Sequence, residues 1–253
     1  MSNSQTRFSN RATDYVAGRP TYPATVIAVL REKIGLDASW RVVDVGAGTG
    51  ISSELFLNAG HAVTAVEPND AMREAAETHF AGRPGYQSIK PPAEATTLPA
   101  GAADLVVAAQ AFHWFDPAAF AGECRRLLSP RGRVLLMWND RTPAGSPVAE
   151  AVESLIRKFA IDYLAVQKKW LAAQDLRQWF EPSSYVEVEL PNDQTQTYDA
   201  MLARLASSSY MPPRDHANFP AMAAELRQVF DAHAPAGRLV LPHTTKLYLG
   251  LPG

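Results

Sequence analysis

One stretch constrains the fold of this chain more than any other: VDVGAGTG at residues 43–50. A β-branched run from Arg41 to Val45 predicts a short buried strand, and a helical pattern follows from Ile51 to Ala59. Alternating glycines permit a tight turn between strand and helix and let a ligand approach the backbone closely. Free N–H groups at the start of the helix give that end a partial positive charge. The sequence therefore predicts a ligand-binding loop between the strand and the helix.

Short apolar runs and helical patterns continue to alternate up to Trp138. We expect strands at 41–45, 61–66, 86–89, 104–109 and 133–138, and helices at 51–59, 69–80 and 118–128, the second of these capped by Asn69 or Asp70. Strands separated by helices need crossover connections, which predicts an α/β fold with a parallel sheet covered on both faces. Beyond Trp138 we expect a helical insertion at 148–180, strands at 185–190 and 239–251, and helices at 201–210 and 221–233.

The second strand is followed by an acid, Glu67, at a place where a carboxylate can accept both hydroxyls of a ribose. The glycine pattern is GxGxG, and position 51 is Ile where a dinucleotide fingerprint needs a third small residue. A glycine-rich turn beside a surface glutamate is the plain structural alternative. Asp44 before the loop and Glu67 after the next strand favour a nucleoside-containing ligand over that alternative.

Composition excludes several function classes. The chain has 24 basic and 26 acidic residues, a net charge of −2, which gives no broad basic face for nucleic acid. One cysteine allows no internal disulfide and fits a reducing compartment. No apolar run has the length of a membrane span, the start of the chain is polar, and the histidines show no metal-site spacing. We therefore expect a cytoplasmic protein that binds no membrane and no metal.

Five segments in order resemble the class I S-adenosylmethionine-dependent methyltransferases, over about residues 7–140. They are VDVGAGTG (43–50), AVEPNDAM (65–72), PPAEATTLP (91–99), AAQAFHWFD (108–116) and GRVLLMWNDR (132–141). The opening FSNRATDYVAGRPTYP is similar to the start of small-molecule members, the trans-aconitate methyltransferase-like and methyltransferase type 11 group. The resemblance implies a doubly wound, mostly parallel seven-stranded sheet, Rossmann-like, whose final strand is antiparallel.

The resemblance also implies a cofactor, S-adenosyl-L-methionine, and a set of residues that contact it. Asp44 and the glycine loop would lie along its methionine part, Glu67 would hold the ribose, and Met72 would pack on the adenine. Gln110 and Ala111 would border the sulfonium. The full set of implied cofactor-binding residues is Arg19, Asp44, Gly46, Ala47, Gly48, Glu67, Pro68, Met72, Ala93, Glu94, Gln110 and Ala111. An ordinary core methionine and a helix-start acid are the alternatives for Met72 and Glu94.

Candidate residues for the methyl acceptor lie near the end of the fourth strand, past the fifth, and in the N-terminal segment. His113 is the candidate general base, because its ordinary pKa of about 6.5 suits proton removal near neutrality. The candidate substrate-binding residues are Tyr15, Tyr22, Trp114, Asn139 and Arg141, with Phe115 as a second member of an aromatic wall. Packing, helix-surface and loop-solvation roles are the alternatives. An acceptor that is already a carboxylate needs no base.

We expect a single methyltransferase domain over 1–253. Within it we expect an N-terminal lid segment at 7–35, a cofactor-binding core at 36–140, a helical insertion or cap at 148–180 and C-terminal strands and helices at 185–251. The predicted activity is methyl transfer to an oxygen, nitrogen or carbon of a small molecule, by a monomer or homodimer. Two alternatives stay open: a non-catalytic S-adenosylmethionine-binding module, and a nicotinamide-dependent oxidoreductase that uses the glycine loop.

Overall fold

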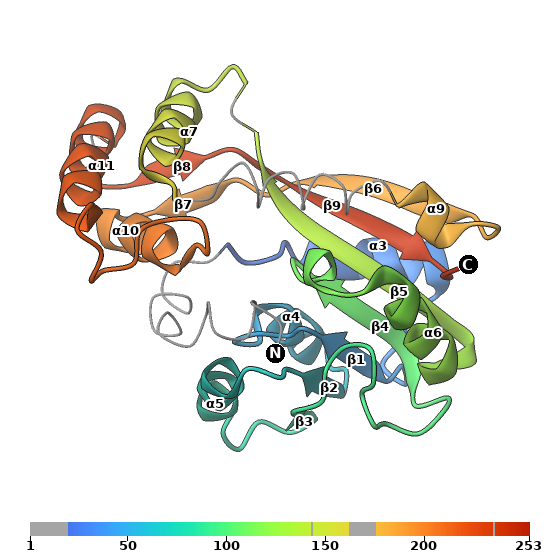
Figure 1. Cartoon of the computed structure of the whole chain (residues 1–253). Helices are drawn as coiled ribbons and strands as arrows, with labels where there is room; N and C mark the ends of the chain where they lie inside the picture. Colours follow the sequence, from blue (N-terminus) through green and yellow to red (C-terminus); the bar gives the residue numbers. More distant parts are fainter. Residues whose placement is uncertain (1–19, 143, 162–175, 235) are drawn as a thin grey trace.

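A computed structural model describes residues 20–142, 144–161, 176–234 and 236–253. Its main feature is a seven-stranded sheet with the strand order β3-β2-β1-β4-β5-β9-β6 (Figure 1). The bounds are β1 Val42–Val45, β2 Val63–Val66, β3 Tyr86–Ile89, β4 Ala103–Ala109, β5 Leu128–Arg141, β6 Tyr185–Pro191 and β9 His243–Gly250. Strands β1 to β5 pair in parallel, and β9 is antiparallel between β5 and β6. This confirms the predicted doubly wound, mostly parallel sheet.

Helices cover both faces of this sheet. On one face α3 (Thr25–Ile34), α4 (Ile51–Asn58) and α5 (Asp70–His79) pack on strand residues such as Val42 and Leu105. On the other face α6 (Pro117–Leu127) and α9 (Arg177–Phe180) pack on Val43 and Val106. Successive strand side chains point to opposite faces, so the central strands contribute to both cores, which is why they are mainly apolar.

The helix starts are set by local side-chain caps. The Asn69 Oδ1 accepts a hydrogen bond from the Met72 backbone N–H (3.1 Å) and caps α5, as the sequence predicts. The Asp116 Oδ1 accepts from the Ala119 N–H (2.9 Å) at the start of α6, whose first residue is Pro117. Both caps place a helix N-terminus directly after a strand and its loop, at the carboxyl edge of the sheet.

A second, smaller group of elements forms what we call the helical lobe. It contains α7 (Pro147–Phe159), α10 (Tyr198–Ser207), α11 (Phe219–His233) and a two-stranded sheet of β7 (Gln194–Gln196) and β8 (Leu239–Leu241), at the left of Figure 1. Val152, Leu155 and Ile156 of α7 pack with Met201, Met222 and Leu226 in its core. The insertion after β5 therefore packs mainly on C-terminal helices. Residues 162–175 of the predicted insertion lie outside the described residues.

Several predicted boundaries differ from the structure. The single strand expected at 239–251 is two strands, because Pro242 has no N–H to donate and separates β8 from β9. The first of these pairs with β7 and the second with β5. Strand β5 is longer than expected, since its pairing with β9 continues to Arg141 opposite His243. Helices α10 and α11 begin at Tyr198 and Phe219, two or three residues earlier than predicted.

The N-terminal region also divides differently from the expectation of a lid at 7–35. Residues 25–34 form α3, and Val26, Ile27 and Leu30 are buried in the core under the sheet. This part of the segment therefore contributes to the core of the fold. Residues 1–19 lie outside the described residues, so a lid function for them stays a prediction.

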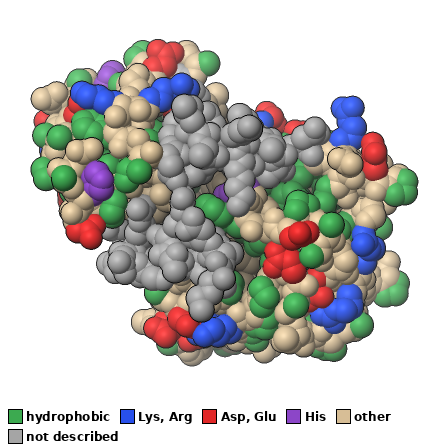
Figure 2. Space-filling model, viewed as in Figure 1, with side chains coloured by type: hydrophobic (Ala, Val, Ile, Leu, Met, Phe, Trp, Pro, Cys, Tyr) green, Lys and Arg blue, Asp and Glu red, His purple; other side chains and the backbone are tan. Residues whose placement is uncertain are grey.

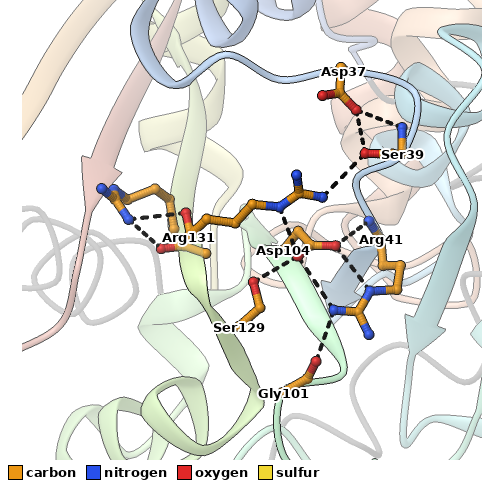
Figure 3. Close-up of polar contacts among 9 residues, drawn as sticks. Asp37, Ser39, Arg41, Gly101, Asp104, Ser129 and Arg131 are labelled. Atoms are coloured by element: carbon orange, nitrogen blue, oxygen red, sulfur yellow. Dashed lines mark hydrogen bonds and ion pairs between the residues drawn. The ribbon is translucent and has the colours of Figure 1, made fainter.

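The amino edge of the sheet is held by a polar network centred on Asp104 at the start of β4 (Figure 3). Its carboxylate accepts hydrogen bonds from Arg41, which precedes β1, and from Ser129 and Arg131 of β5. Burial alone would raise the pKa of Asp104, but these donors together outweigh it and hold the pKa well below its usual value. The network ties the starts of three strands together, which makes this edge structural.

Charges of both signs are mixed on the face of the molecule shown in Figure 2, with no continuous basic patch among the described side chains there. Within the described ranges, no helix combines the length and the apolar character that crossing a membrane requires.

Candidate active site

The glycine loop lies where the sheet changes direction, since β1 pairs with β2 on one side and β4 on the other. Gly46, Gly48 and Gly50 all have positive φ (69°, 58° and 88°), a conformation that strains any other residue. A Cβ at Gly46 would stand 2.6 Å from the Ala111 Cβ and 3.0 Å from the Phe115 ring, too close for either to stay in place. The loop therefore needs glycine for conformation and for space. Ligands of open α/β sheets bind in the crevice at this point.

Asp44, the last acid before the loop, is fully buried. Its Oδ2 accepts hydrogen bonds from the Ser52 and Ser53 hydroxyls in the first turn of α4 (2.7 and 2.6 Å). Its Oδ1 is buried with no hydrogen-bond partner among the described residues. Burial raises the pKa of Asp44 to about 6, against the lowering effect of the serines. One carboxylate oxygen thus remains available for a hydrogen-bond donor or a cation.

Glu67 follows β2, and its side chain contacts the backbone of the glycine loop. The Gly48 N–H donates to its Oε2 and the Asn69 N–H to its Oε1, both at 2.8 Å. Burial raises the pKa of this carboxyl, and the nearby charge of Asp44 adds to the effect. Each carboxylate oxygen has two lone pairs, so each can still accept one hydroxyl donor. The side chain is fixed in position by the backbone and keeps its capacity to bind a diol.

The predicted adenine-side residues occupy the loops next to Glu67. Met72 is buried in the first turn of α5, and Pro68 is half-buried. Ala93 is buried in the core of the α6 face. The Glu94 Oε1 accepts from the backbone N–H of Asp116 (2.9 Å), which ties the loop after β3 to the start of α6. For Glu94 this is a structural contact, and contact with a ligand stays a prediction, as it does for the others.

The end of β4 carries the most strained residue of the site. Gln110 has a φ of 56°, which non-glycine residues rarely adopt. Its backbone N–H donates to the Met137 carbonyl (2.8 Å) and its Nε2 to the Asn139 carbonyl (3.0 Å). Backbone and side chain together fasten it to β5. The strained turn brings Ala111 against Gly46, so that the end of β4 and the glycine loop meet; contact of Gln110 and Ala111 with a cofactor stays a prediction.

His113 and Trp114 lie in the short 3-10 turn after Gln110, η1 (Phe112–Trp114). Both are partly exposed, and their rings lie 4.9 Å apart. Phe112, by contrast, is buried against Trp138 and Trp179. Phe115 packs on Phe120 and stands beside the glycine loop. The turn therefore presents a histidine and a tryptophan and buries Phe112, while Phe115 is partly buried beside the loop, a difference that the sequence could not show.

Asn139 and Arg141 at the end of β5 have different surroundings. Asn139 is nearly buried and is engaged by Thr21, Asn192 and Thr245, so its side chain is held inside the protein. Arg141 donates to the Tyr210 hydroxyl (3.1 Å) and pairs with Glu153 of α7 (3.2 Å). These contacts connect the sheet to the helical lobe. A substrate role for either residue stays a prediction.

The remaining predicted residues are in the N-terminal segment. Tyr15 and Arg19 lie outside the described residues. Tyr22 packs against the core on the α3 face. Residues that sequence analysis missed are Ser52 and Ser53, which hold Asp44, and Asn192 and Thr245, which hold Asn139. The serines had a local signal, since two hydroxyls open the helix after the loop, whereas the other two had none.

Comparison with known proteins supports the predicted resemblance over the core of the sheet. Residues 43–136 match the family model described as a methyltransferase domain. That segment runs from the glycine loop through Glu67, Gln110 and His113 to β5, so this core is similar to a methyltransferase domain, as expected from the sequence. The finer resemblance to the trans-aconitate methyltransferase-like group stays a prediction.

Among individual relatives, an uncharacterised methyltransferase of Mycobacterium tuberculosis is 37% identical over 134 residues, which are 53% of this chain and 52% of the relative. An uncharacterised methyltransferase-like protein of Schizosaccharomyces pombe is 28% identical over 165 residues, 64% of this chain and 63% of the relative. The chain thus spans about half to two thirds of the length of these curated relatives.

Solved structures extend the likeness to nearly the whole fold. A protein of Anaeromyxobacter dehalogenans, itself provisionally assigned as a type II methyltransferase, superposes with a TM-score of 0.67 at 23% identity over 92% of this chain and 97% of that one. The YcgJ protein of Bacillus subtilis superposes with a TM-score of 0.52 at 18% identity, over 89% of this chain and 97% of that one. At these identities the likeness concerns the fold.

Proposed function

We propose that this chain is an S-adenosyl-L-methionine-dependent methyltransferase that methylates an oxygen, nitrogen or carbon atom of a small molecule. The observation that carries the proposal is the pairing of the glycine loop with Glu67 at the switch point of the sheet, through the Gly48 N–H. The matched methyltransferase domain spans this site and supports the choice of cofactor.

The residues at the carboxyl edge fit that cofactor on three counts. Gly46, Gly48 and Gly50 carry no side chain, so an extended ligand can approach the backbone of the loop closely. The buried Asp44 Oδ1 is an acceptor for an ammonium group, directly or through water. Glu67 has lone pairs left for a ribose diol. The positive φ of Gln110 places the strand end beside the loop, where the methionine part would lie.

When bound, S-adenosyl-L-methionine supplies a methyl group already activated on a sulfonium, so the protein contributes mainly position. Glu67 and Asp44 would orient the cofactor, and the Phe115 ring beside the loop would help to exclude water. Alignment of two reactants can contribute several kcal/mol, up to about 10. His113 lies one turn beyond Gln110 and would take the proton from an acceptor hydroxyl or amine; a carboxylate acceptor would bypass it.

Calorimetric titration of S-adenosylmethionine and S-adenosylhomocysteine into wild-type protein and Glu67→Ala tests the cofactor. We expect micromolar binding by the wild type and at least a tenfold loss in the variant, about 1.4 kcal/mol. Glu74→Ala, the same change at an exposed position on α5, is the matched control and should bind like the wild type. Absence of binding to folded wild-type protein would exclude the proposal.

Turnover separates the enzyme from its alternatives. Release of S-adenosylhomocysteine with members of a panel of small-molecule acceptors would support methyl transfer, and His113→Gln should slow the step for acceptors that lose a proton. Binding without turnover across the panel would favour a non-catalytic binding module. A fluorescence titration with NADH addresses the oxidoreductase alternative, and saturable NADH binding combined with no S-adenosylmethionine binding would favour it.

A further inference from the structure

Two asparagines far apart in the sequence converge on one backbone carbonyl, that of Thr21, and Thr245 and Gln110 bond to one of them, Asn139. The Asn139 Nδ2 at the end of β5 donates to it (3.2 Å), and so does the Asn192 Nδ2 after β6 (2.8 Å). The second Asn192 Nδ2 hydrogen is directed to the Asn139 Oδ1 (3.0 Å). Thr245 of β9 donates its hydroxyl to the same oxygen (2.6 Å). Gln110 joins through its Nε2, which donates to the Asn139 carbonyl.

The chemistry of these groups fixes their orientation. A backbone carbonyl can only accept, so both asparagines must turn their NH2 groups toward Thr21. That leaves the Asn139 oxygen to accept from Asn192 and Thr245, which fills both of its lone pairs. The Asn192 oxygen in turn accepts from the Gln194 Nε2 (2.9 Å). The reverse orientation of Asn139 would place its NH2 group against that of Asn192.

Burial makes this arrangement rigid. Thr245 is fully buried and Asn139 nearly so, and a partly satisfied network in such surroundings costs more than an apolar substitute. Because every member is uncharged, the network holds at any pH at which the protein folds. It lies at the carboxyl edge of the sheet and includes Gln110, whose strained turn brings Ala111 to the glycine loop.

We propose that Asn192 and Thr245 are positioning residues of the methyltransferase site: they hold the Asn139 carboxamide against the Thr21 carbonyl and so position the residue whose backbone carbonyl accepts from the Gln110 side chain. The network therefore couples the Thr21 carbonyl, at the start of the described chain, to the Gln110 turn on the cofactor side of the site. This inference rests on the proposed function.

The test compares matched substitutions in the full-length chain, with S-adenosylhomocysteine as the probe. Thr245→Val keeps the β-branched shape and removes the donor to Asn139. Thr244→Val is the control, since the neighbouring side chain lies on the opposite face of β9, where its hydroxyl contacts Thr142. Asn192→Ala and Asn192→Asp both remove the NH2 group, the second with the side-chain shape retained. Urea unfolding establishes that each variant is folded.

We expect Thr245→Val and both Asn192 variants to bind the probe about fivefold more weakly or worse, the net value of one hydrogen bond. Thr244→Val should bind like the wild type. Hydrogen exchange of the amides at residues 21–27 should quicken in the first three variants and stay unchanged in the control. This second readout reports the attachment of Thr21 whether or not a ligand binds.

The outcomes separate the two proposals. Wild-type binding with unchanged affinity in Asn192→Ala and Thr245→Val would overturn the positioning role and leave the cofactor assignment intact. Unchanged exchange at residues 21–27 in those variants would overturn the attachment of Thr21 itself. A folded wild type that binds neither S-adenosylmethionine nor S-adenosylhomocysteine would overturn the proposed function, and the positioning role would fall with it.

Discussion

Replacement of Gly46 by alanine tests whether the glycine loop and the end of β4 are in the close contact that the site requires. The φ of Gly46 is 69°, so an alanine is strained by about 1–2 kcal/mol from conformation alone. Its Cβ would also stand 2.6 Å from the Ala111 Cβ and 3.0 Å from the Phe115 ring. Such overpacking costs typically about 1–3 kcal/mol more. The free energy of unfolding should therefore fall by about 2–5 kcal/mol in Gly46→Ala.

Gly101→Ala is the matched control for this substitution. Its φ is 70°, almost the same, and a Cβ there would meet nothing within 4 Å. It should lose only the conformational part, about 1–2 kcal/mol. The difference between the two variants isolates the contact with Ala111 and Phe115. Urea unfolding measures both losses, and the slopes should match the wild type if the unfolded states are alike.

Two results would refute this reasoning. Equal losses in Gly46→Ala and Gly101→Ala would mean that no close contact exists at Gly46. Failure of Ala111→Gly to recover part of the loss, when added to Gly46→Ala, would mean that the contact involves other atoms. In the expected case the double variant regains part of the lost stability, because Ala111→Gly removes the atom that the new Cβ meets.

Three further predictions concern stability. Gly50→Ala should lose more free energy of unfolding than Gly60→Ala, although both positions have a φ near 90°. The reason is that only the Cβ at position 50 would meet the Phe80 ring, 2.3 Å away. Equal urea midpoints for the two variants would contradict this prediction. Asp44→Asn should be more stable than the wild type at pH 7 by up to about 3 kcal/mol, since the pKa of Asp44 rises from 3.8 to about 6 and each pKa unit corresponds to about 1.4 kcal/mol. A raised carboxyl pKa destabilises the native state above it, so this advantage should vanish as the pH falls from 7 through 6 toward 4, and a pH-independent advantage would contradict the assignment. Asp104→Asn should lower the free energy of unfolding by about 1–3 kcal/mol near neutrality. Because the pKa of Asp104 is lowered in the native state, the stabilisation by its carboxylate is present above pH 4 and disappears on acidification below that value. Thermal unfolding of both proteins across pH would measure this dependence.

The Asp44 and Glu67 carboxyls give the site its own dependence on pH. Burial raises the pKa of both, so each charge is costly in the free protein. A bound ammonium group or diol stabilises the charged forms. Affinity for S-adenosylmethionine should therefore increase as the pH rises through about 6, and this dependence should weaken in Asp44→Asn.

The sequence by itself determined the features that depend on local pattern. Alternating strands and helices, the glycine loop from Gly46 to Gly50 and the Asn69 cap were all predictable, because periodicity and backbone conformation are properties of neighbouring residues. The position of Glu67 beside the loop was predictable as well, since parallel strands end at the same edge of a sheet. These features define the fold class and the proposed cofactor site.

Only the tertiary structure decided which distant side chains share a hydrogen bond or a core. Asn139 meets Thr21, Asn192 and Thr245 across 118, 53 and 106 residues of sequence, and a single polar residue in a loop or strand carries no pattern that predicts its partner. The packing of α7 on the C-terminal helices and the division of the last strand at Pro242 were decided in the same way. The physical reason is that such contacts depend on how the elements pack, whereas strand and helix patterns depend on each segment alone.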